Sequence, residues 1–469
     1  YISPTNLGNV SMRIFSPKGK LNTITRIYNQ NDIFNKFGKP DVNSDGMPTY
    51  GYNLHGSTII AQSTSNLNLM RVAEDGDAYS IIGMNTSAEI TADTTTATTG
   101  ITSTEENNVI SDIENLPEDE EIKFSTWGPD KNADNIAIGF EFWHPYCDWR
   151  FKYDDREEVK LESDTFSSGE DVITAFESIS GDNIIETKIV KVSIYTKNSS
   201  QNWPDDTSGF YNLSPDEVFY GTIESLVDDE GNQLQLAEQI NNQSNLIYMK
   251  YDNGWGDWSW KEIYENISKV SATNNEYEYD IPFTYQSFDK GIVNSPSNSN
   301  IDGISIFGSR EVIQNIDYFL EPSYNSVVKT EVDKMIGKRL DCMGIFQTGS
   351  VTDKTVSDVK NNENYGYANA SYLATAAGYD KIFDRFNSKM IYLPKCIYLA
   401  RAELLKTNPW DASAGIGTGT LPTNGQNVVF SKNEIGSLYS ANINTSRKIP
   451  NVGDTLWGQK TMLSKNSNL

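Results

Sequence analysis

The feature that most constrains the fold is a repeated alternation of apolar and polar side chains in the middle of the chain. Residues 136–142, 190–194 and 277–285 each place β-branched or aromatic side chains at every second position. A period of two with these residue types is typical of strands that bury one face. The pattern predicts a β-rich domain over residues 131–299.

Helical periods appear among strands after residue 300. A helix is predicted between an N-cap at Ser326 and an end near Gly337. Its apolar stripe consists of Val328, Val332, Met335 and Ile336. The nearly continuous apolar run of residues 340–346 predicts a buried strand. Residues 316–320 predict another strand, which would complete a strand–helix–strand unit, although residues 312–320 also fit a helical period.

The two remaining parts of the chain differ sharply in character. Residues 54–63 predict a helix and residues 67–73 a strand, whereas residues 74–130 are rich in Thr, Ser, Asp and Glu and show no periodicity. We expect this interval to be a polar linker or a small exposed insert. A further helix is predicted from Pro394, which suits a first helical turn, to about Lys406.

These elements predict an α+β, multidomain fold. The mixed α/β core would be built from both chain ends, residues 1–73 together with 300–469. The β-rich domain of residues 131–299 would be inserted between them as an outer domain. With 469 residues, of which 37% are hydrophobic, the chain is long enough for more than one core.

The charge of the chain argues against some partners. Lys and Arg number 38 and Asp and Glu 64, for a formal net charge of −26. Phosphate backbones would be repelled overall, so nucleic acid is not an expected partner. No apolar run approaches the roughly 20 residues of a membrane-spanning helix. The widely separated Cys147, Cys342 and Cys396 do not form a disulfide framework and fit a reducing compartment.

Nucleophilic catalysis finds little support in the sequence. The chain has two histidines, His55 and His144, and neither lies in a nucleophile motif. His144 and Cys147 have a spacing that metal sites use, but zinc requires four ligands and no second pair lies nearby. We therefore expect no catalytic residues, no metal ligands and no cofactor.

Three weaker patterns have more ordinary explanations. Residues 41–46 resemble the first half of a calcium loop, with oxygen-bearing Asp41, Asn43 and Asp45, but the twelfth position is Tyr52 rather than Glu. A polar turn is favoured there, and the pattern leaves calcium open.

The other two patterns concern sugar chemistry. Three tryptophans could stack on a carbohydrate, but such spacing is more often one face of a strand. They are Trp255, Trp258 and Trp260. Two acidic pairs could supply acid–base carboxylates, although a solvated surface is the default in so acidic a chain. These are Asp154-Asp155 and Glu157-Glu158.

Several short runs, in a fixed order along the chain, resemble the contractile tail sheath proteins of large bacteriophages. The N-terminal runs are Phe37-Gly38-Lys39-Pro40 and Asn68-Leu69-Met70-Arg71-Val72. The middle runs are Glu217-Val218-Phe219-Tyr220, Asp229-Glu230-Gly231-Asn232 and Ala237-Glu238-Gln239-Ile240-Asn241. The C-terminal runs are Asp341-Cys342, Tyr379-Asp380-Lys381, Leu393-Pro394, Ala400-Arg401, Asn408-Pro409-Trp410-Asp411-Ala412-Ser413-Ala414-Gly415 and Gly453-Asp454-Thr455-Leu456-Trp457-Gly458-Gln459-Lys460-Thr461.

The resemblance implies a structural protein rather than an enzyme. Sheath subunits stack as hexameric rings around a tail tube, with the core facing the tube and inserted domains facing outward. Extended terminal arms add strands to neighbouring subunits. Contraction drives the tube through the host envelope. The expected partners are other sheath subunits, the tail tube, the baseplate and the tail terminator, with no membrane insertion.

The resemblance also implies a location and a set of buried residues. The protein would belong to the virion tail and assemble in the cytoplasm of the host bacterium. Relatives extend further at both ends, so residues 1–469 are expected to be a fragment. Trp457 and Cys342 are expected to be buried in one domain with residues 1–73. Alternatives left open are another virion module, such as a baseplate or spike component, and a carbohydrate-binding surface protein.

Overall fold

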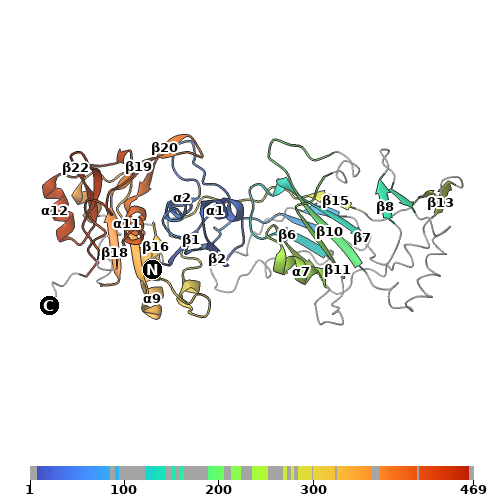
Figure 1. Ribbon diagram of the computed structural model, residues 1–469, viewed down its shortest axis with the longest axis horizontal. Coiled ribbons are helices and arrows are strands. Elements are labelled where there is room, and N and C mark those ends of the chain that lie inside the picture. The colour runs from blue at the N-terminus through green and yellow to red at the C-terminus, as the bar shows by residue number, and fades with distance from the viewer. Residues whose placement is uncertain are drawn as a thin grey trace. The chain divides into compact units, whose positions relative to one another are not determined.

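The computed structural model describes most of the chain, and its elements fall into two compact units (Figure 1). The described residues are 8–84, 90–93, 122–142, 150–153, 159–162, 189–204, 213–222, 235–251, 268–271, 276–278, 284–297, 299–322, 325–361, 370–408 and 411–463. The core unit combines residues up to Asp77 with residues from Val293 onward, and the β unit lies within residues 78–292. Each unit is described by itself.

The core unit is organised by one six-stranded sheet that mixes strands from distant parts of the sequence. In spatial order its strands are β18 (Leu373–Ala377), β17 (Met343–Thr348), β16 (Tyr318–Glu321), β1 (Val10–Ile14), β3 (Leu67–Arg71) and β2 (Ile24–Ile27). Every neighbouring pair is parallel except β2 and β3. Val10 of β1 lies beside both Tyr318 and Leu67, so the N-terminal strand is at the centre of the sheet.

The predicted strand–helix–strand unit is confirmed as β16, α9 (Ser326–Arg339) and β17. The side chain of Asn325, rather than Ser326, caps the helix by accepting from the backbone N–H of Val327. The helix continues past Gly337 and ends where Leu340 adopts φ 61°, so the predicted stop was two residues early. The alternative of a helix over residues 312–320 is wrong, because Tyr318–Glu321 is a strand.

The predicted face of α9 is buried, and a buried arginine ends the helix. Arg339 is 1% exposed and donates to the backbone carbonyls of Phe307, Ser309, Ile313 and Gln314 and to the carboxylate of Asp341. A buried guanidinium is tolerated only when its donors are satisfied. These bonds therefore fix the segment before β16, including the 3₁₀ turn η2 (Ser305–Gly308), against the end of α9.

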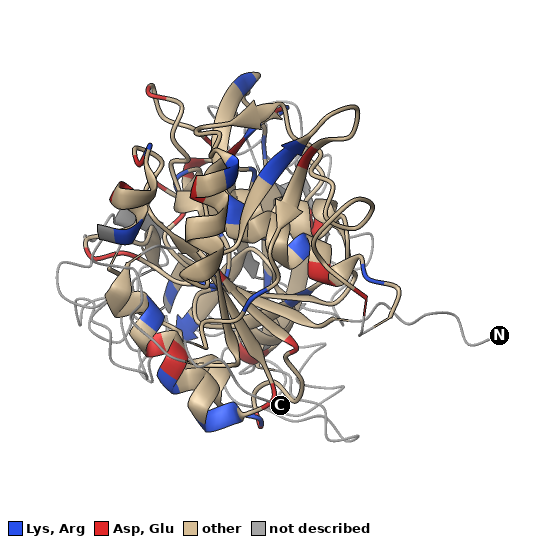
Figure 2. Cartoon of the chain, turned by 90° about the vertical axis from the view of Figure 1, so that its left-hand side faces the viewer, with Lys and Arg blue, Asp and Glu red and all other residues tan. Residues whose placement is uncertain are grey.

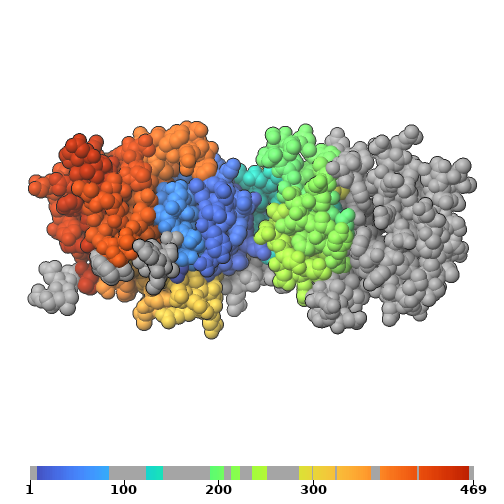
Figure 3. All heavy atoms as spheres, in the orientation of Figure 1, coloured from blue at the N-terminus to red at the C-terminus, as the bar shows by residue number. Residues whose placement is uncertain are grey.

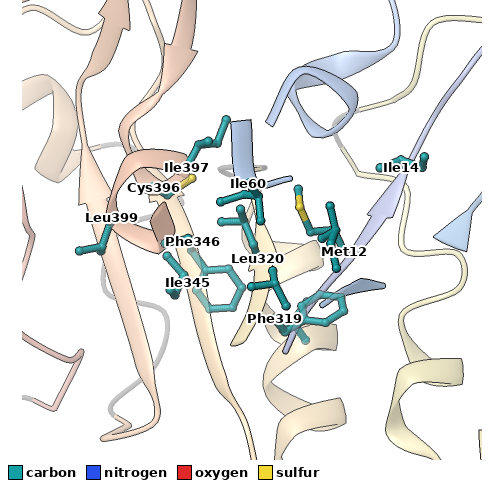
Figure 4. Close-up of a cluster of buried hydrophobic side chains, with 14 of the residues drawn as sticks. Met12, Ile14, Ile60, Phe319, Leu320, Ile345, Phe346, Cys396, Ile397 and Leu399 are labelled. Carbon is teal, nitrogen blue, oxygen red and sulfur yellow. The ribbon is translucent and has the colours of Figure 1, made fainter. Parts of the chain in front are cut away.

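Two helices pack together over the sheet. Helix α2 (Gly51–Ile60) contacts α11 (Lys395–Leu404), the helix predicted after Pro394. A residue at the Gly56 position larger than glycine would press on Ile397, whose side chain lies 3.0 Å from an added Cβ. Ile60, Ile397, Cys396 and the sheet residues Leu320 and Phe346 converge in one apolar cluster (Figure 4).

The rest of the core unit surrounds this sheet. Its helices are α1 (Gln30–Phe37), α10 (Val356–Asn361) and α12 (Lys432–Ser440). A three-stranded sheet has the order β20 (Lys389–Pro394), β19 (Tyr379–Asp384) and β21 (Gly425–Gln426), and β22 (Thr445–Ile449) pairs with β23 (Gly453–Trp457). Figure 3 shows the N-terminal segment, in blue, packed directly against the orange C-terminal segments.

The β unit is antiparallel in its described strands. One sheet has the order β11 (Glu217–Thr222), β10 (Ile189–Thr196), β7 (Ile136–Phe142) and β15 (Thr284–Ser287). A second has β12 (Ile247–Tyr251), β6 (Ile122–Thr126), β4 (Ile81–Met84) and β5 (Ile90–Asp93). Smaller elements are the pairs β8 (Arg150–Tyr153) with β9 (Val159–Glu162) and β13 (Ser268–Ser271) with β14 (Glu276–Glu278), the turn η1 (Ala133–Asn135) and helix α7 (Leu236–Gln243).

The expectation of a polar linker over residues 74–130 is wrong where the structure describes it. Strands β4, β5 and β6 lie in that interval, and Ile82 and Phe124 are fully buried. The strands are short and interrupted by polar runs. β6 pairs with β12, which lies over 120 residues away in the sequence, and no local period reveals that pairing.

The charge of the chain is concentrated in one unit. The β unit, residues 78–98 and 109–292, contains 13 Lys and Arg and 40 Asp and Glu, so 13 − 40 gives −27. The remaining residues contain 25 and 24, so 25 − 24 gives +1. Figure 2 shows basic and acidic residues interspersed over one side of the chain. The acidic surplus is thus a property of the β unit's sequence, not of the core.

Candidate functional sites: buried polar clusters of the core unit

A buried ion pair joins the two central strands of the parallel sheet. Arg13 Nε of β1 lies 2.6 Å from Glu321 Oε2 of β16, and their side chains are 3% and 1% exposed. Asn53 Nδ2 of α2 donates to the other Glu321 oxygen at 3.2 Å and to the Arg13 carbonyl at 2.9 Å. Arg13 Nη1 also donates to Asn300 Oδ1 at 3.2 Å. Arg13 and Glu321 each make further hydrogen bonds, and such bonds are needed to offset the cost of removing two charges from water.

This pair lies beside a crevice of about 190 Å³ at the carboxyl ends of the parallel strands. Strand β1 leads through α2 to β3 on one side, while β16 leads through α9 to β17 on the other, so the sheet reverses its winding between β1 and β16. In open α/β sheets this is the usual position of a ligand site. Here, however, Arg13 and Glu321 already bond one another. The remaining lining of the crevice therefore consists mainly of loop residues, several of which carry hydroxyl groups.

The crevice wall comes from several segments of the core unit. Its other lining residues are Phe15, Met47, Pro48, Thr49, Gly51, Tyr52, Asn53, Ser295, Pro296, Ser297, Ser350 and Val351.

His55 belongs to a second buried cluster. Its Nε2 lies 3.1 Å from Asp384 Oδ2 of β19, which also accepts from Asn387 Nδ2 at 2.7 Å. Burial by itself raises the pKa of Asp384, but these bonds and the Phe386 backbone N–H together lower it to about 2. The nearby hydroxyls of Ser57 and Thr58 donate to backbone carbonyls. The arrangement ties α2 to β19 and lacks the nucleophile of a triad.

Two lysines are also buried in the core unit. Lys395 Nζ bonds Asp380 Oδ1, and both side chains are almost wholly excluded from solvent. Burial raises the pKa of Asp380, while the Lys395 ammonium opposes that rise. Lys329 of α9 is 1% exposed, and burial lowers its pKa to about 7. These groups are charges held inside a core, and none lines the crevice.

The two described cysteines are free and buried. Burial raises the pKa of the Cys342 thiol to about 11 and that of Cys396 well above its usual value. Neither thiol is poised as a thiolate, which is the nucleophilic form. Cys342 is 8% exposed in the core unit, as predicted. Trp457 is 40% exposed, so its predicted burial is wrong.

The possible calcium loop is a hydrogen-bonded turn. Asn43 Oδ1 accepts from the backbone N–H groups of Asp45 and Met47, at 3.0 and 2.9 Å, and Asp41 Oδ1 accepts from the Val42 N–H at 2.9 Å. Across the described part of the chain, no group of three or more His, Cys, Asp or Glu side chains is arranged to hold a metal ion.

The remaining candidate residues lie outside what the structure describes. They are His144, Cys147, Trp255, Trp258, Trp260, Asp154, Asp155, Glu157 and Glu158, and also the run Asp229-Glu230-Gly231-Asn232 and Pro409 and Trp410 of the C-terminal runs. No helix in the described part of the chain combines the length and apolar character of a membrane span.

Comparison with known proteins gave matches to solved structures alone. No protein-family model and no curated protein matches the chain. A sheath tail protein from Listeria innocua aligns with 10% identity over 98% of this chain and 70% of its own, at a TM-score of 0.46. One from Desulfitobacterium hafniense aligns with 10% identity over 99% and 74%, at 0.45. The contracted helical sheath of the anti-feeding prophage aligns with 14% identity over 39% and 49%, at 0.28.

Sequence reasoning missed the Arg13–Glu321 pair, whose members are 308 residues apart. Arg13 is the one charged residue in an otherwise apolar or small strand, which was the available signal. It also missed His55–Asp384, since nothing local links α2 to β19.

Proposed function

We propose that this chain is a structural subunit of a contractile phage tail sheath. It would polymerise as stacked hexameric rings around a tail tube and contract to drive the tube through the host envelope. The core unit would face the tube, and the β unit would face outward. The chain would have no catalytic role and no cofactor.

One observation carries this proposal. The runs that resemble the sheath family are scattered over more than 400 residues, yet the described terminal runs lie in a single unit. They fall at the end of α1, in β3, before β17, in β19, at the end of β20, in α11 and in β23. The described middle runs lie in β11 and α7 of the β unit. This division supports the proposal because the resemblance implies a sheath core built from both ends of the chain, with the middle of the chain inserted as a separate domain.

The chemistry of the core is consistent with a structural role. Two of its buried polar pairs, Arg13 with Glu321 and His55 with Asp384, join segments more than 300 residues apart. Such clusters fix the relative positions of elements rather than react. We infer that the core acts as a rigid body, while extended terminal arms link neighbouring subunits by strand addition.

The proposed partners follow from that role. They are neighbouring sheath subunits, the tail tube, the baseplate and the tail terminator. The protein would be a component of the virion tail, assembled in the host cytoplasm.

Negative-stain electron microscopy tests this function directly. The full-length protein would be purified and imaged over a range of salt and protein concentrations. Hollow, striated tubes are expected. A protein that stays monomeric under all conditions would contradict the proposal. Saturable glycan-array binding that depends on Trp255, Trp258 or Trp260 would then favour the carbohydrate-binding alternative.

A further inference from the structure

One buried ion pair of the core unit uses little of its hydrogen-bonding capacity. Lys395, the first residue of α11, bonds Asp380 Oδ1 of β19, and the two side chains are 1% and 0% exposed. Among the described residues, no donor reaches Asp380 Oδ2, and Lys395 Nζ has no second acceptor. An ammonium carries three donors, and both oxygens of a carboxylate accept. One hydrogen bond therefore serves two groups that could each make several.

The Arg13–Glu321 pair of the same unit provides the contrast. Asn53 donates to the second Glu321 oxygen, and Arg13 has a further acceptor in Asn300. A buried ion pair offsets its desolvation only when additional bonds of this kind are present. Within the described part of the chain the Lys395–Asp380 pair lacks them, so its charged form is costly where it lies.

The surroundings of Asp380 favour its uncharged form. Burial raises the pKa of this carboxyl, the Lys395 ammonium opposes the rise, and the nearby Asp454 carboxylate adds to it. Transfer of one proton from the ammonium to the carboxylate gives a neutral amine and a neutral carboxylic acid. Burial favours these forms over the charged ones. They are also the forms in which an amine can attack a carboxyl carbon.

The backbone holds the amine against the carboxyl group. The Lys395 N–H donates to the Gly378 carbonyl at 3.1 Å, and a Cβ added at Gly378 would lie 3.3 Å from Lys395 Cε. The pairing of β19 with β20 places Asp380 opposite Leu393, two residues before Lys395. Two groups held together in this way react as if at a concentration far above any reached in solution.

We propose that Lys395 and Asp380 condense into an intramolecular isopeptide bond in the folded protein. The Nζ–Cγ bond forms and the Cγ–Oδ2 bond breaks. Oδ2, the oxygen without a donor, leaves as water with the proton of the carboxylic acid and one proton of the amine. No other reactant is consumed. The amide keeps one donor and one acceptor, so fewer buried polar groups need partners than in the ion pair.

The bond closes a covalent ring that contains the β19–β20 hairpin. It joins β19 to the first turn of α11, a helix that contacts β16, β17 and β18 of the central sheet. The hairpin then stays attached to this helix even when the hydrogen bonds between them break. The inference rests on the core unit alone and does not depend on the sheath function.

Mass spectrometry of the denatured full-length protein, intact and after trypsin digestion, tests for the bond. We expect an intact mass one water below that of the sequence and no cleavage after Lys395. A branched peptide should join the segments that contain Asp380 and Lys395. A mass equal to that of the sequence, with ordinary cleavage after Lys395, would overturn the proposal. A lost water that fragmentation places elsewhere, such as a succinimide at Asp45-Gly46, would overturn it too.

A second lysine–carboxylate pair in the same chain is a matched control. Lys406 Nζ lies 2.6 Å from Glu403 Oε2, and both side chains are 15% exposed, so water reaches their charges. The same digest should show this pair unlinked. Equal linkage of the two pairs would refute the claim that burial drives the condensation.

Two variants separate a covalent bond from an ion pair. Asp380→Asn supplies an amide that the Lys395 amine can also attack, with ammonia rather than water as the leaving group, so the same branched peptide should form. Lys395→Met cannot form it and should have the full mass of its sequence. A folded D380N protein without the branched peptide would contradict attack on Cγ, and a branch that persists in K395M would contradict the assignment to Lys395. The wild-type measurement stands even where a variant fails to fold.

Discussion

Both units bring distant parts of the sequence together, but the strands pair differently in each. The core unit places residues 10–14 beside residues 318–321 in a parallel sheet and bridges them with the buried Arg13–Glu321 pair. The described strands of the β unit are antiparallel, and its sequence carries the whole acidic surplus of the chain. Parallel strands, buried on both faces, need long crossovers, whereas antiparallel strands tolerate a solvated face. The core unit is therefore held together by a buried ion pair between distant segments, whereas the β unit differs from it in having antiparallel strands and an acidic sequence.

The largest expected difference in stability between the two units comes from breaking the Arg13–Glu321 ion pair. Arg13→Met leaves Glu321 charged and buried without its guanidinium, so we expect a loss of about 3–5 kcal/mol in the stability of the core unit. Hydrogen exchange measured by mass spectrometry should accelerate in β1 and β16 but not in β7 and β10.

A surface substitution provides the control for that experiment. Lys334→Met removes an exposed pair with Glu331 and should cost less than about 1 kcal/mol. If Arg13→Met were as mild as this control, the pair would not join the two central strands energetically.

Replacing the buried Lys329 should have the next largest effect, and it should raise the stability of the core unit rather than lower it. Burial lowers its pKa to about 7 in the folded chain, against 10.5 ordinarily. Between these values the unfolded chain binds more protons, so core stability should rise as pH increases from 7 toward 10. Lys329→Met should remove that rise and stabilise the core at pH 7 by about 1–4 kcal/mol.

Urea titrations at several pH values would measure the Lys329 effect. The β unit, which does not contain this residue, should keep its own pH dependence in the variant. An unchanged pH slope for the core would mean that Lys329 is not the group responsible.

The His55–Asp384 cluster predicts a smaller, acid-side effect. The folded pKa of Asp384, about 2, lies below its ordinary 3.8, so its contribution is complete above pH 4 and lost as pH falls through 2. Asp384→Asn should cost about 1–3 kcal/mol at neutral pH and little at pH 2. Circular dichroism melts at the two pH values test this, and an equal cost at both would contradict it.

The smallest expected effect concerns Trp457. Its ring is 40% exposed and lies 5.2 Å from the Arg447 guanidinium carbon. Trp457→Ala should therefore cost only about 0.5–1 kcal/mol. A loss of several kcal/mol in thermal or urea unfolding would show that the ring is buried after all, as the sequence suggested.

Local patterns predicted the elements that carry their own period. The apolar stripe from Val328 to Ile336 gave α9, and Pro394 marked the start of α11. The alternation in residues 136–142 gave β7 over the same span. In each case the burial that shapes the element repeats within a few residues, so the sequence records it locally.

What the sequence did not reveal depends on contacts between distant segments. β6 is stabilised by β12, a partner that no local pattern reveals. Arg13 is stabilised by Glu321, and the lone charge in the strand marks Arg13 without indicating its partner. Trp457 was expected in the core because its run resembles the sheath family. It is the last residue of β23, on the same face as Arg447, where the ring stacks on a guanidinium instead of entering the core.

Cryo-electron microscopy of assemblies formed by the full-length protein would show which unit lines the tube. A helical tube is expected whose inner wall is the six-stranded sheet and helices of the core unit, with the β unit at the outer radius. A reconstruction in which residues 78–292 line the lumen, or preparations that contain no helical assembly, would contradict it.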